Sequence, residues 1–394
     1  MNRMLLRLWK RSDAIEVECR LDFREPLSGS FTFQLACGYQ VDRIVDSDGR
    51  CLEFESAEKR TIDSPYRADR GCYVVKNALG TQFSIFYSGA SRAQHTLFSD
   101  DVLAINRASG WYPCPISPGG GVWDAEVFIY PGLDYVVLNA HFLPEENAWY
   151  YRPQEDELFI VALKNYRCKR SQGGVIYYYP QDDTDDHIAA LCVNSLAGLL
   201  PYFESLYGCN TVDEVSIVSL PTSFNAGAYN IDRTIILNRL VFAYGKDTAV
   251  SEEPITHLIG HELAHNWCCG AAGNWEDWLN ETSAEWSALA YLLENGHTSY
   301  VHDVILDYCR EEKPEPIRTR DGERPSQVHL KGTLLFYHLY RMYDLAVIKY
   351  LLKAFVELRE KNTDSWLRRI GKHYPQLIPE IIEGLHAELL GGRL

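Results

Sequence analysis

The sequence predicts an α+β fold in which an all-β N-terminal part, a sandwich or saddle, precedes a mostly helical C-terminal part. Residues 14–180 consist of short segments that alternate apolar and polar side chains, separated by turn signals such as PLSGS, DSDG and PGLD. This spacing is typical of an all-β sandwich or barrel. Helical periodicity begins after the acidic run QDDTDD, and from about residue 251 onward the pattern is helical throughout.

The β part is built from segments rich in β-branched and aromatic residues, which favour a pleated, half-buried surface. They are AIEVECRLDF, FTFQLAC, CYVVKN, QFSIFY, AEVFIY, DYVVLNAHF and, last, VIYYYP. We place the domain boundary at the acidic run, which gives an N-terminal β domain over residues 1–182 and a second domain over residues 183–394. A chain of 394 residues is long enough for two or three domains.

The second domain begins with a helix in HIAALCVNSLAGLLPYFESLYG and continues with two short strands, DEVSIVSL and RTIILN. SFNAGAYN lies between these strands. Three further helices are expected over residues 251–268, 280–296 and 330–358. The first is expected to stop at Gly270, because glycine ends helices readily.

Composition narrows the class of protein. Lys and Arg number 38 against 54 Asp and Glu, so the net charge is 38 − 54 = −16. An acidic chain without basic runs argues against nucleic acid or an anionic membrane as a partner. Eleven scattered cysteines without a CxxC pair favour a reduced compartment, and we expect a soluble cytoplasmic protein. Its oligomeric state is left open.

The stretch GHELAHNW, residues 260–267, carries the chemistry. His261 and His265 lie four residues apart, so a helix places both imidazoles on one face, where they can hold one zinc ion. Glu262 points beside them, which suits a general base for zinc-activated water. Glu281, in WLNETSAEW at the start of the next helix, supplies the third ligand that a catalytic zinc site requires. A chance HExxH is the alternative, and the downstream glutamate argues against it.

HELAHNW followed by WLNE resembles the gluzincin metallopeptidases of the membrane alanyl aminopeptidase family, whose signature is HELAHQW and then WLNEGFA. SGWYPC with residues 124–140 is similar to that family's N-terminal β domain, and residues 328–343 are similar to its VYEKGA helix. The resemblance implies a β-sandwich saddle on a thermolysin-like catalytic domain that binds one zinc ion. We expect the family's helical-repeat C-terminal domain to be missing, since the sequence ends at Leu394.

The substrate strand departs from the family pattern. Gly227, Ala228, Tyr229 and Asn230 stand where the family has GAMEN, so the glutamate that holds a substrate's free α-amine is missing. The resemblance still implies that this edge strand pairs with the peptide backbone. The interval between His265 and Glu281, 15 residues, is also shorter than the family's usual spacing.

The family tyrosine that stabilises the oxyanion is also replaced. His329 stands at that position, two residues before Lys331. We expect it to donate a hydrogen bond to the developing negative charge, since histidine can act as such a donor. A surface histidine is the alternative reading, and Tyr337 is a second candidate donor, although a core tyrosine is the better interpretation.

Several nearby residues have two readings. His257, one turn before His261, is either a fourth ligand or, as we favour, a hydrogen-bonded histidine behind the ligands. Glu285 faces either the site or solvent. Cys268 and Cys269 are interpreted as core residues rather than ligands.

These features predict a zinc metallopeptidase, foremost an aminopeptidase, that acts on peptides. One alternative is an endopeptidase or a hydrolase of another amide or ester, because such an enzyme tolerates the loss of the amine anchor. The other is a zinc-stabilised peptide-binding protein with little or no turnover. An intact HExxH argues against that last alternative, since a structural zinc site has no need of Glu262.

Overall fold

The computed structural model describes residues 2–60, 68–91, 96–117, 123–153, 158–180, 183–208, 214–221, 228–231, 233–238 and 251–391. The chain forms two compact units, each with its own core. Unit 1 comprises residues 1–167 and 220–227, and unit 2 comprises residues 168–219 and 228–394. We describe each unit by itself.

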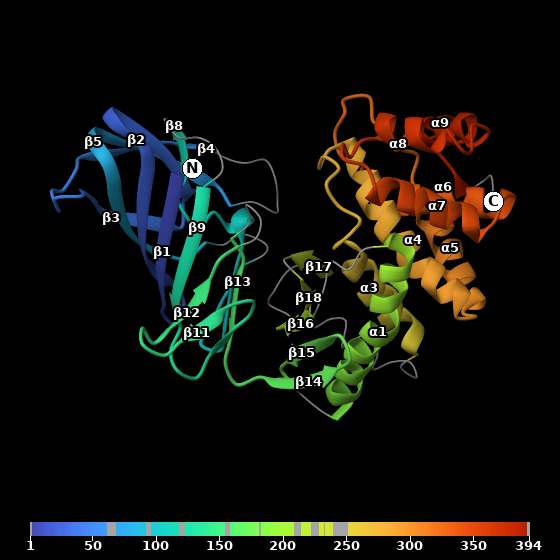
Figure 1. Cartoon of the computed structure of the whole chain (residues 1–394), viewed down its shortest axis with the longest axis horizontal. Coiled ribbons are helices and arrows are strands. Elements are labelled where there is room, and N and C mark those ends of the chain that lie inside the picture. The colour runs from blue at the N-terminus through green and yellow to red at the C-terminus, as the bar shows by residue number, and fades with distance from the viewer. Residues whose placement is uncertain are drawn as a thin grey trace. The chain divides into compact units, whose positions relative to one another are not determined.

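Unit 1 contains, among the described strands, a nine-stranded sheet with the main path β11-β12-β9-β1-β2-β5-β3. Side chains alternate along it: Met4, Leu6 and Leu8 of β1 are buried, while Leu5 and Arg7 between them are half-buried. Figure 1 shows the long strands β1, β2, β5 and β9 running side by side. The strands are β1 (Asn2–Lys10), β2 (Ile15–Ala36), β3 (Tyr39–Asp46), β4 (Phe54–Arg60), β5 (Arg70–Gly89), β8 (Cys114–Ser117), β9 (Trp123–Tyr130), β11 (His141–Leu143) and β12 (Ala148–Tyr151).

A second sheet of unit 1 has the order β10-β13-β7-β6. Its strands are β6 (Leu97–Phe98), β7 (Val102–Ile105), β10 (Val136–Val137) and β13 (Ile160–Leu163). Leu103 and Ile160 of this sheet share one buried core with Leu6 and Phe33 of the larger sheet. The two sheets therefore pack face to face, as the alternation of the sequence predicts.

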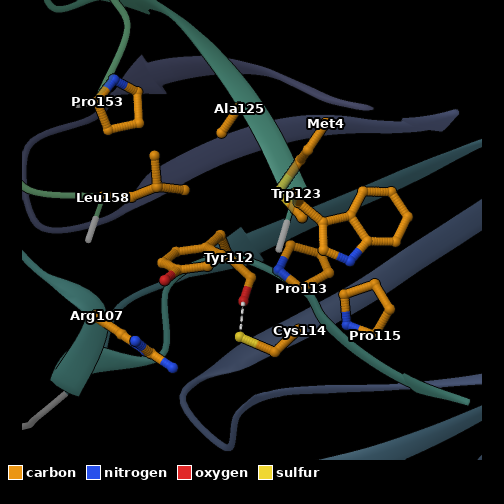
Figure 2. Close-up of a pocket in the computed structure, with 10 residues that line it drawn as sticks. All are labelled: Met4, Arg107, Tyr112, Pro113, Cys114, Pro115, Trp123, Ala125, Pro153 and Leu158. Carbon is orange, nitrogen blue, oxygen red and sulfur yellow. Dashed lines mark hydrogen bonds between the residues drawn. The ribbon is translucent and has the colours of Figure 1, made fainter. Parts of the chain in front are cut away.

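The segment WYPC of unit 1 lies beside a pocket of about 260 Å³. Figure 2 shows the ring of Tyr112, Pro113 and the indole of Trp123 along its wall, with the side chain of Arg107 at one end. Cys114 Sγ lies 3.7 Å from the backbone oxygen of Tyr112. All residues that line this pocket belong to unit 1.

Unit 2 contains a five-stranded sheet of order β14-β15-β16-β18-β17, in which β17 forms one edge (Figure 1). The strands are β14 (Arg167–Ser171), β15 (Gly174–Tyr178), β16 (Val215–Leu220), β17 (Ala228–Ile231) and β18 (Thr234–Asn238). β15 pairs with β16 in parallel, and β17 pairs with β18 antiparallel. The parallel pair is joined through a helix, as parallel strands require.

The boundary between the units therefore differs from the expected one at residues 182 and 183. VIYYYP forms β15 and belongs to the sheet of unit 2, and unit 2 already begins at residue 168. The physical reason is that alternation identifies a strand but not its partner. The partner of β15, β16, lies beyond the intervening helix in sequence.

Unit 2 also contains eight α-helices among its described residues (Figure 1). They are α1 (Asp183–Tyr207), α3 (Glu252–Ala264), α4 (Trp278–Glu294), α5 (Thr298–Glu311), α6 (Val328–Met342), α7 (Leu345–Val356), α8 (Thr363–Ile370) and α9 (Leu377–His386). The single helix expected over residues 330–358 is two helices, because the side chain of Asp344 caps α7 by accepting from the amide of Val347.

By length and composition alone, α1 is long and apolar enough to cross a membrane. Its apolar side chains, among them Ile188, Val193, Leu196 and Phe203, instead lie in the core of unit 2 with those of α3 and α4. The helix thus packs one face into the core of unit 2.

Candidate metal centre

Three side chains of unit 2 converge on one point. His261 lies in the last turn of α3, His265 is the C-cap residue of that helix, and Glu281 lies in the first turn of α4. The two Nε2 atoms lie 3.3 Å apart, and each lies 3.5 Å from Oε2 of Glu281. The donors are thus close together although 15 residues separate His265 from Glu281.

These distances fit a zinc ion. A tetrahedral ion with ligand bonds of about 2.0–2.1 Å has ligands about 3.3–3.4 Å apart, so the three atoms form one face of such a tetrahedron. Oε2 of Glu281 is buried and has no hydrogen bond of good geometry among the described residues. A buried carboxylate oxygen without a well-aligned hydrogen bond is costly, and a cation between the three donors would satisfy it.

Each histidine is oriented through its other ring nitrogen. His261 Nδ1 lies 2.8 Å from Oε2 of Glu285, and His265 Nδ1 lies 3.3 Å from the backbone oxygen of Cys268. With a metal ion bound, Nδ1 of each ring would carry the proton and Nε2 would present its lone pair to the common point, which is how ligand histidines are held in metal sites.

Glu285 is the centre of a buried network. Its Oε1 accepts from the hydroxyl of Tyr308 at 2.7 Å and lies 2.9 Å from Nε2 of His257. The Nδ1 of His257 lies 3.0 Å from the hydroxyl of Tyr300. Burial opposes the ionisation of Glu285, but His257 and His261 outweigh it and lower its pKa well below the usual range. Glu285 is therefore a buried carboxylate that contacts Nδ1 of His261. His257 is not a fourth ligand in this arrangement, because its two ring nitrogens contact Glu285 and Tyr300.

Glu281 is held from a different side. Burial opposes its ionisation as well, but the neighbouring His261, His265 and His329 lower its pKa. Its Oε1 accepts from the guanidinium of Arg324 at 3.1 Å. This arrangement keeps the carboxylate charged and turns one of its two oxygens toward the histidines.

The asparagine of WLNE fixes the segment that connects the two helices. The side chain of Asn280 accepts from the amide of Ala271 and donates to its backbone oxygen, both at 3.1 Å. It also donates to Asp277 at 2.7 Å. The loop between α3 and α4 is thereby tied to the first turn of α4, the turn that carries Glu281.

Glu262 lies beside the donors and is 5% exposed. Burial raises its pKa, and His261 and His265 oppose that shift only in part. Its backbone oxygen accepts from the side chain of Asn230 at 2.7 Å, which joins the edge strand β17 to α3. A carboxylate with a raised pKa next to a cation site can take up a proton and return it.

His329 lies at the rim of the site. Its Nδ1 is 3.0 Å from Oε2 of Glu281, and its side chain is half exposed. His261, Glu281 and His329 also form a group of potential ligand atoms within 4.8 Å of one another. His329 therefore stands next to the three donors, at the start of α6, with access to solvent.

The structure brings together the predicted residues His261, Glu262, His265, Glu281 and His329. Of the predicted substrate strand, Ala228, Tyr229 and Asn230 form most of β17, and Gly227 lies outside the described residues. Tyr337 lies further along α6 and is largely buried. Cys268 is buried as expected, whereas the expectation for Cys269 was wrong, because it is exposed.

Sequence reasoning missed Arg324 and left Glu285 between two readings. Glu285 follows Glu281 by four residues and so lies on the same face of the helix. Because Glu281 is an expected metal ligand, this spacing indicates that Glu285 also faces the site that contains His261. Arg324 lies in the charged loop before α6 and carries no sequence signal, because its role depends on where that loop folds.

Known proteins resemble the chain over part of its sequence and in its fold. No family model matches the chain. A stretch of 94 residues is 32% identical to aminopeptidase N of Acetobacter pasteurianus and covers 22% of this chain and 26% of that protein. The chain thus matches about a quarter of the length of that relative.

Solved structures share the whole fold. Leukotriene A4 hydrolase from Saccharomyces cerevisiae aligns with a TM-score of 0.64 at 15% identity, over 98% of this chain and 67% of that chain. An M1 zinc metallopeptidase from Deinococcus radiodurans, bound to a Tyr-Ser-Ala substrate, aligns with a TM-score of 0.62 at 13% identity, over 99% of this chain and 94% of that one. The predicted fold class, a β domain followed by a mostly helical domain, is confirmed.

Proposed function

We propose that the chain is a zinc metallopeptidase of the gluzincin class that hydrolyses peptide bonds. The observation that carries the proposal is the tetrahedral face formed by His261, His265 and Glu281 next to the buried Glu262. A zinc ion held there would supply a Lewis acid that polarises the substrate carbonyl and lowers the pKa of water. The likeness to aminopeptidase N and to zinc metallopeptidase structures supports the same class.

In this proposal Glu262 acts as the proton carrier. It removes a proton from the attacking water and then delivers it to the leaving amine, for which a raised pKa is suited. His329 donates a hydrogen bond to the carbonyl oxygen as negative charge develops there. Its position beside Glu281 and its exposure to solvent support this role, because a substrate can reach it.

The peptide binds along β17. Among the described strands β17 has β18 as its only neighbour, so its other edge is available to an extended peptide. The bond from Asn230 to the backbone of Glu262 fixes this strand relative to the base. Aminopeptidase action is the leading form of the proposal, supported by the relative that bears that name.

One observation favours a second form, an endopeptidase or a hydrolase of another amide or ester. β17 carries the side chains of Ala228, Tyr229, Asn230 and Ile231, and none of them is a carboxylate that could hold a free α-amine. Asn230 is itself engaged with α3. A substrate without a free α-amine therefore forgoes no ion pair at this strand.

The experiment measures zinc content together with hydrolysis of a matched panel of aminoacyl and N-blocked fluorogenic peptides, for the wild type and Glu262→Gln. One zinc per chain, cleavage of free-amine substrates and loss of cleavage in the variant are expected for the aminopeptidase. Cleavage of the blocked peptides at similar rates identifies the second form. Zinc without turnover on either panel refutes the peptidase and leaves a zinc-stabilised peptide-binding protein.

We further propose a cytoplasmic location without nucleic-acid or membrane partners. The net charge of −16 supports this proposal. The ten cysteines that the structure describes are all free, which fits a reducing compartment.

A further inference from the structure

One arginine bridges two carboxylates at the start of α4. Arg324 comes from the loop between α5 and α6, and its Nε lies 2.5 Å from Oδ2 of Asp277 while a terminal nitrogen lies 3.1 Å from Oε1 of Glu281. Asp277 precedes Glu281 by four residues, so both carboxylates lie on the same face of the helix. A planar guanidinium can bond both carboxylates at once, because its donors are spread over a rigid fork. A lysine ammonium is a compact point charge and does this less well.

The bridge rests on a fixed support. The other oxygen of Asp277 accepts from Asn280, which is bonded in turn to the backbone of Ala271. The side chains of Asp277 and Glu281 are 14% and 13% exposed and that of Arg324 is 40% exposed, so the carboxylate side of each ion pair is shielded from water while the guanidinium remains partly open to it. Shielded, charge-assisted pairs hold geometry better than surface pairs do.

The bond to Arg324 limits the number of oxygens that Glu281 can offer to a metal ion. Arg324 occupies Oε1, and Oε2 alone lies 3.5 Å from Nε2 of both His261 and His265. A carboxylate held in this way supplies one ligand oxygen rather than two. With two histidines, one oxygen makes three protein ligands and leaves the fourth tetrahedral position open for water or substrate.

We propose that Arg324 is a positioning residue that holds Glu281 as a one-oxygen metal ligand and thereby keeps the coordination number low. This inference rests on the metal site of the proposed function. Without Arg324, Oε1 is free to turn toward the metal or the carboxylate is free to swing away. Either change weakens binding or raises the coordination number.

The test compares Arg324→Met, which keeps the length of the side chain, with Arg324→Lys and with Arg320→Met. Arg320 lies in the same loop, is exposed, and has no ion pair or hydrogen bond among the described residues, so it is a matched control. The zinc dissociation constant is measured by competition with a chromophoric chelator. The visible spectrum of the cobalt-substituted protein reports coordination number.

We expect Arg324→Met to raise the zinc dissociation constant about 10- to 100-fold, the usual range for residues that orient a metal ligand. Its cobalt spectrum should differ from that of the wild type, with lower intensity where Oε1 turns toward the metal and raises the coordination number. Arg324→Lys should fall between the wild type and Arg324→Met, and Arg320→Met should match the wild type. Urea unfolding of the metal-free variants, compared with Arg320→Met, separates lost ligand geometry from lost folding.

Equal dissociation constants and equal cobalt spectra for Arg324→Met and Arg320→Met overturn the inference. So does a loss of zinc binding that follows only from unfolding of the metal-free variant. Peptide hydrolysis is measured in the same preparations. Hydrolysis by the wild type with unchanged zinc affinity in Arg324→Met defeats the inference alone, whereas zinc binding without hydrolysis defeats the proposed function and leaves the inference standing.

Discussion

Gly332 lies where α6 crosses α4, next to the metal centre. A methyl group at this glycine would lie 1.6 Å from Oγ1 of Thr282 and 2.9 Å from its Cβ. Thr282 is fully buried and follows Glu281, while Gly332 comes three residues after His329. The substitution Gly332→Ala therefore tests whether the close approach of these two helices sets the geometry of the site.

The size of the effect follows from the distances. Rotation of the Thr282 side chain relieves the contact with Oγ1 but not the one with Cβ, which the backbone fixes. Carbon atoms in contact are about 3.5 Å apart or more, so the 2.9 Å contact must open by about 0.6 Å. Overpacking of this kind costs about 1–3 kcal/mol.

Whether Gly332→Ala raises or lowers the free energy of unfolding is the clearest test of the clash. In a helix interior without a clash, alanine is about 1 kcal/mol more stable than glycine. We expect Gly332→Ala to be less stable than the wild type in urea unfolding, despite that propensity. A shift of several tenths of an ångström between the turns that carry Glu281 and His329 should also lower kcat/KM about tenfold or more, since a displacement of about 1 Å can cost about 100-fold.

Gly384→Ala is the matched control. Its added methyl group would meet Leu335 Cδ1 at 2.3 Å, on the contact between α9 and α6, away from the donors. We expect it to lose stability while zinc affinity and kcat/KM stay at wild-type values. The double variant Gly332→Ala with Thr282→Gly removes the clash and should recover activity beyond the sum of the single changes. A stabilised, fully active Gly332→Ala refutes the reasoning.

Three further predictions follow from the contacts of the site. Glu285→Gln, which keeps the shape but removes the charge behind His261, should weaken zinc binding about 10- to 100-fold, and an unchanged dissociation constant in a chelator competition would count against its role. Asn280→Ala should lower the free energy of unfolding by about 0.5–1.5 kcal/mol, because the part-buried amide of Ala271 and Oδ1 of Asp277 lose a hydrogen bond; equal urea midpoints would contradict this. Zinc at about 100 times its dissociation constant should stabilise the wild type by about 2.7 kcal/mol, measured by calorimetry with and without chelator, and His261→Ala should show no such gain.

The sequence predicted the parts of the site that depend on local spacing. The interval of four between His261 and His265 sets their common helix face, and the same interval relates Glu281 to Glu285. Prediction of the strands in unit 1 succeeded for a similar reason, since alternation along one strand is a local property. The expected boundary at residues 182 and 183 differs from the observed one because strand pairing is not local: β15 finds its partner β16 after a whole helix.

The residues that hydrogen-bond to the ligands or to Glu285 could not be predicted from local spacing. Tyr300 and Tyr308 reach the site from α5, and Arg324 reaches it from the loop beyond that helix. Their contribution depends on how α5 and the following loop pack against α4. Tyrosine is common both on surfaces and in cores, and arginine is common on surfaces, so their presence in the sequence carries no signal of a metal site.

Glycines at the helix contacts determine how closely the helices that carry the donors can approach one another. A methyl group at Gly260, directly before His261, would lie 3.0 Å from Cβ of Ala288 on α4 and 3.1 Å from Leu199 on α1. Gly260 therefore allows α3 to approach α4, as Gly332 allows α6 to approach it from another side. Two histidines on one helix can bind an ion only weakly; the third ligand comes from α4, so its supply depends on these two close approaches. His261 and His265 of the HExxH motif and Glu281 of α4 provide the donors, and the close approaches at Gly260 and Gly332 bring the helices that carry them together.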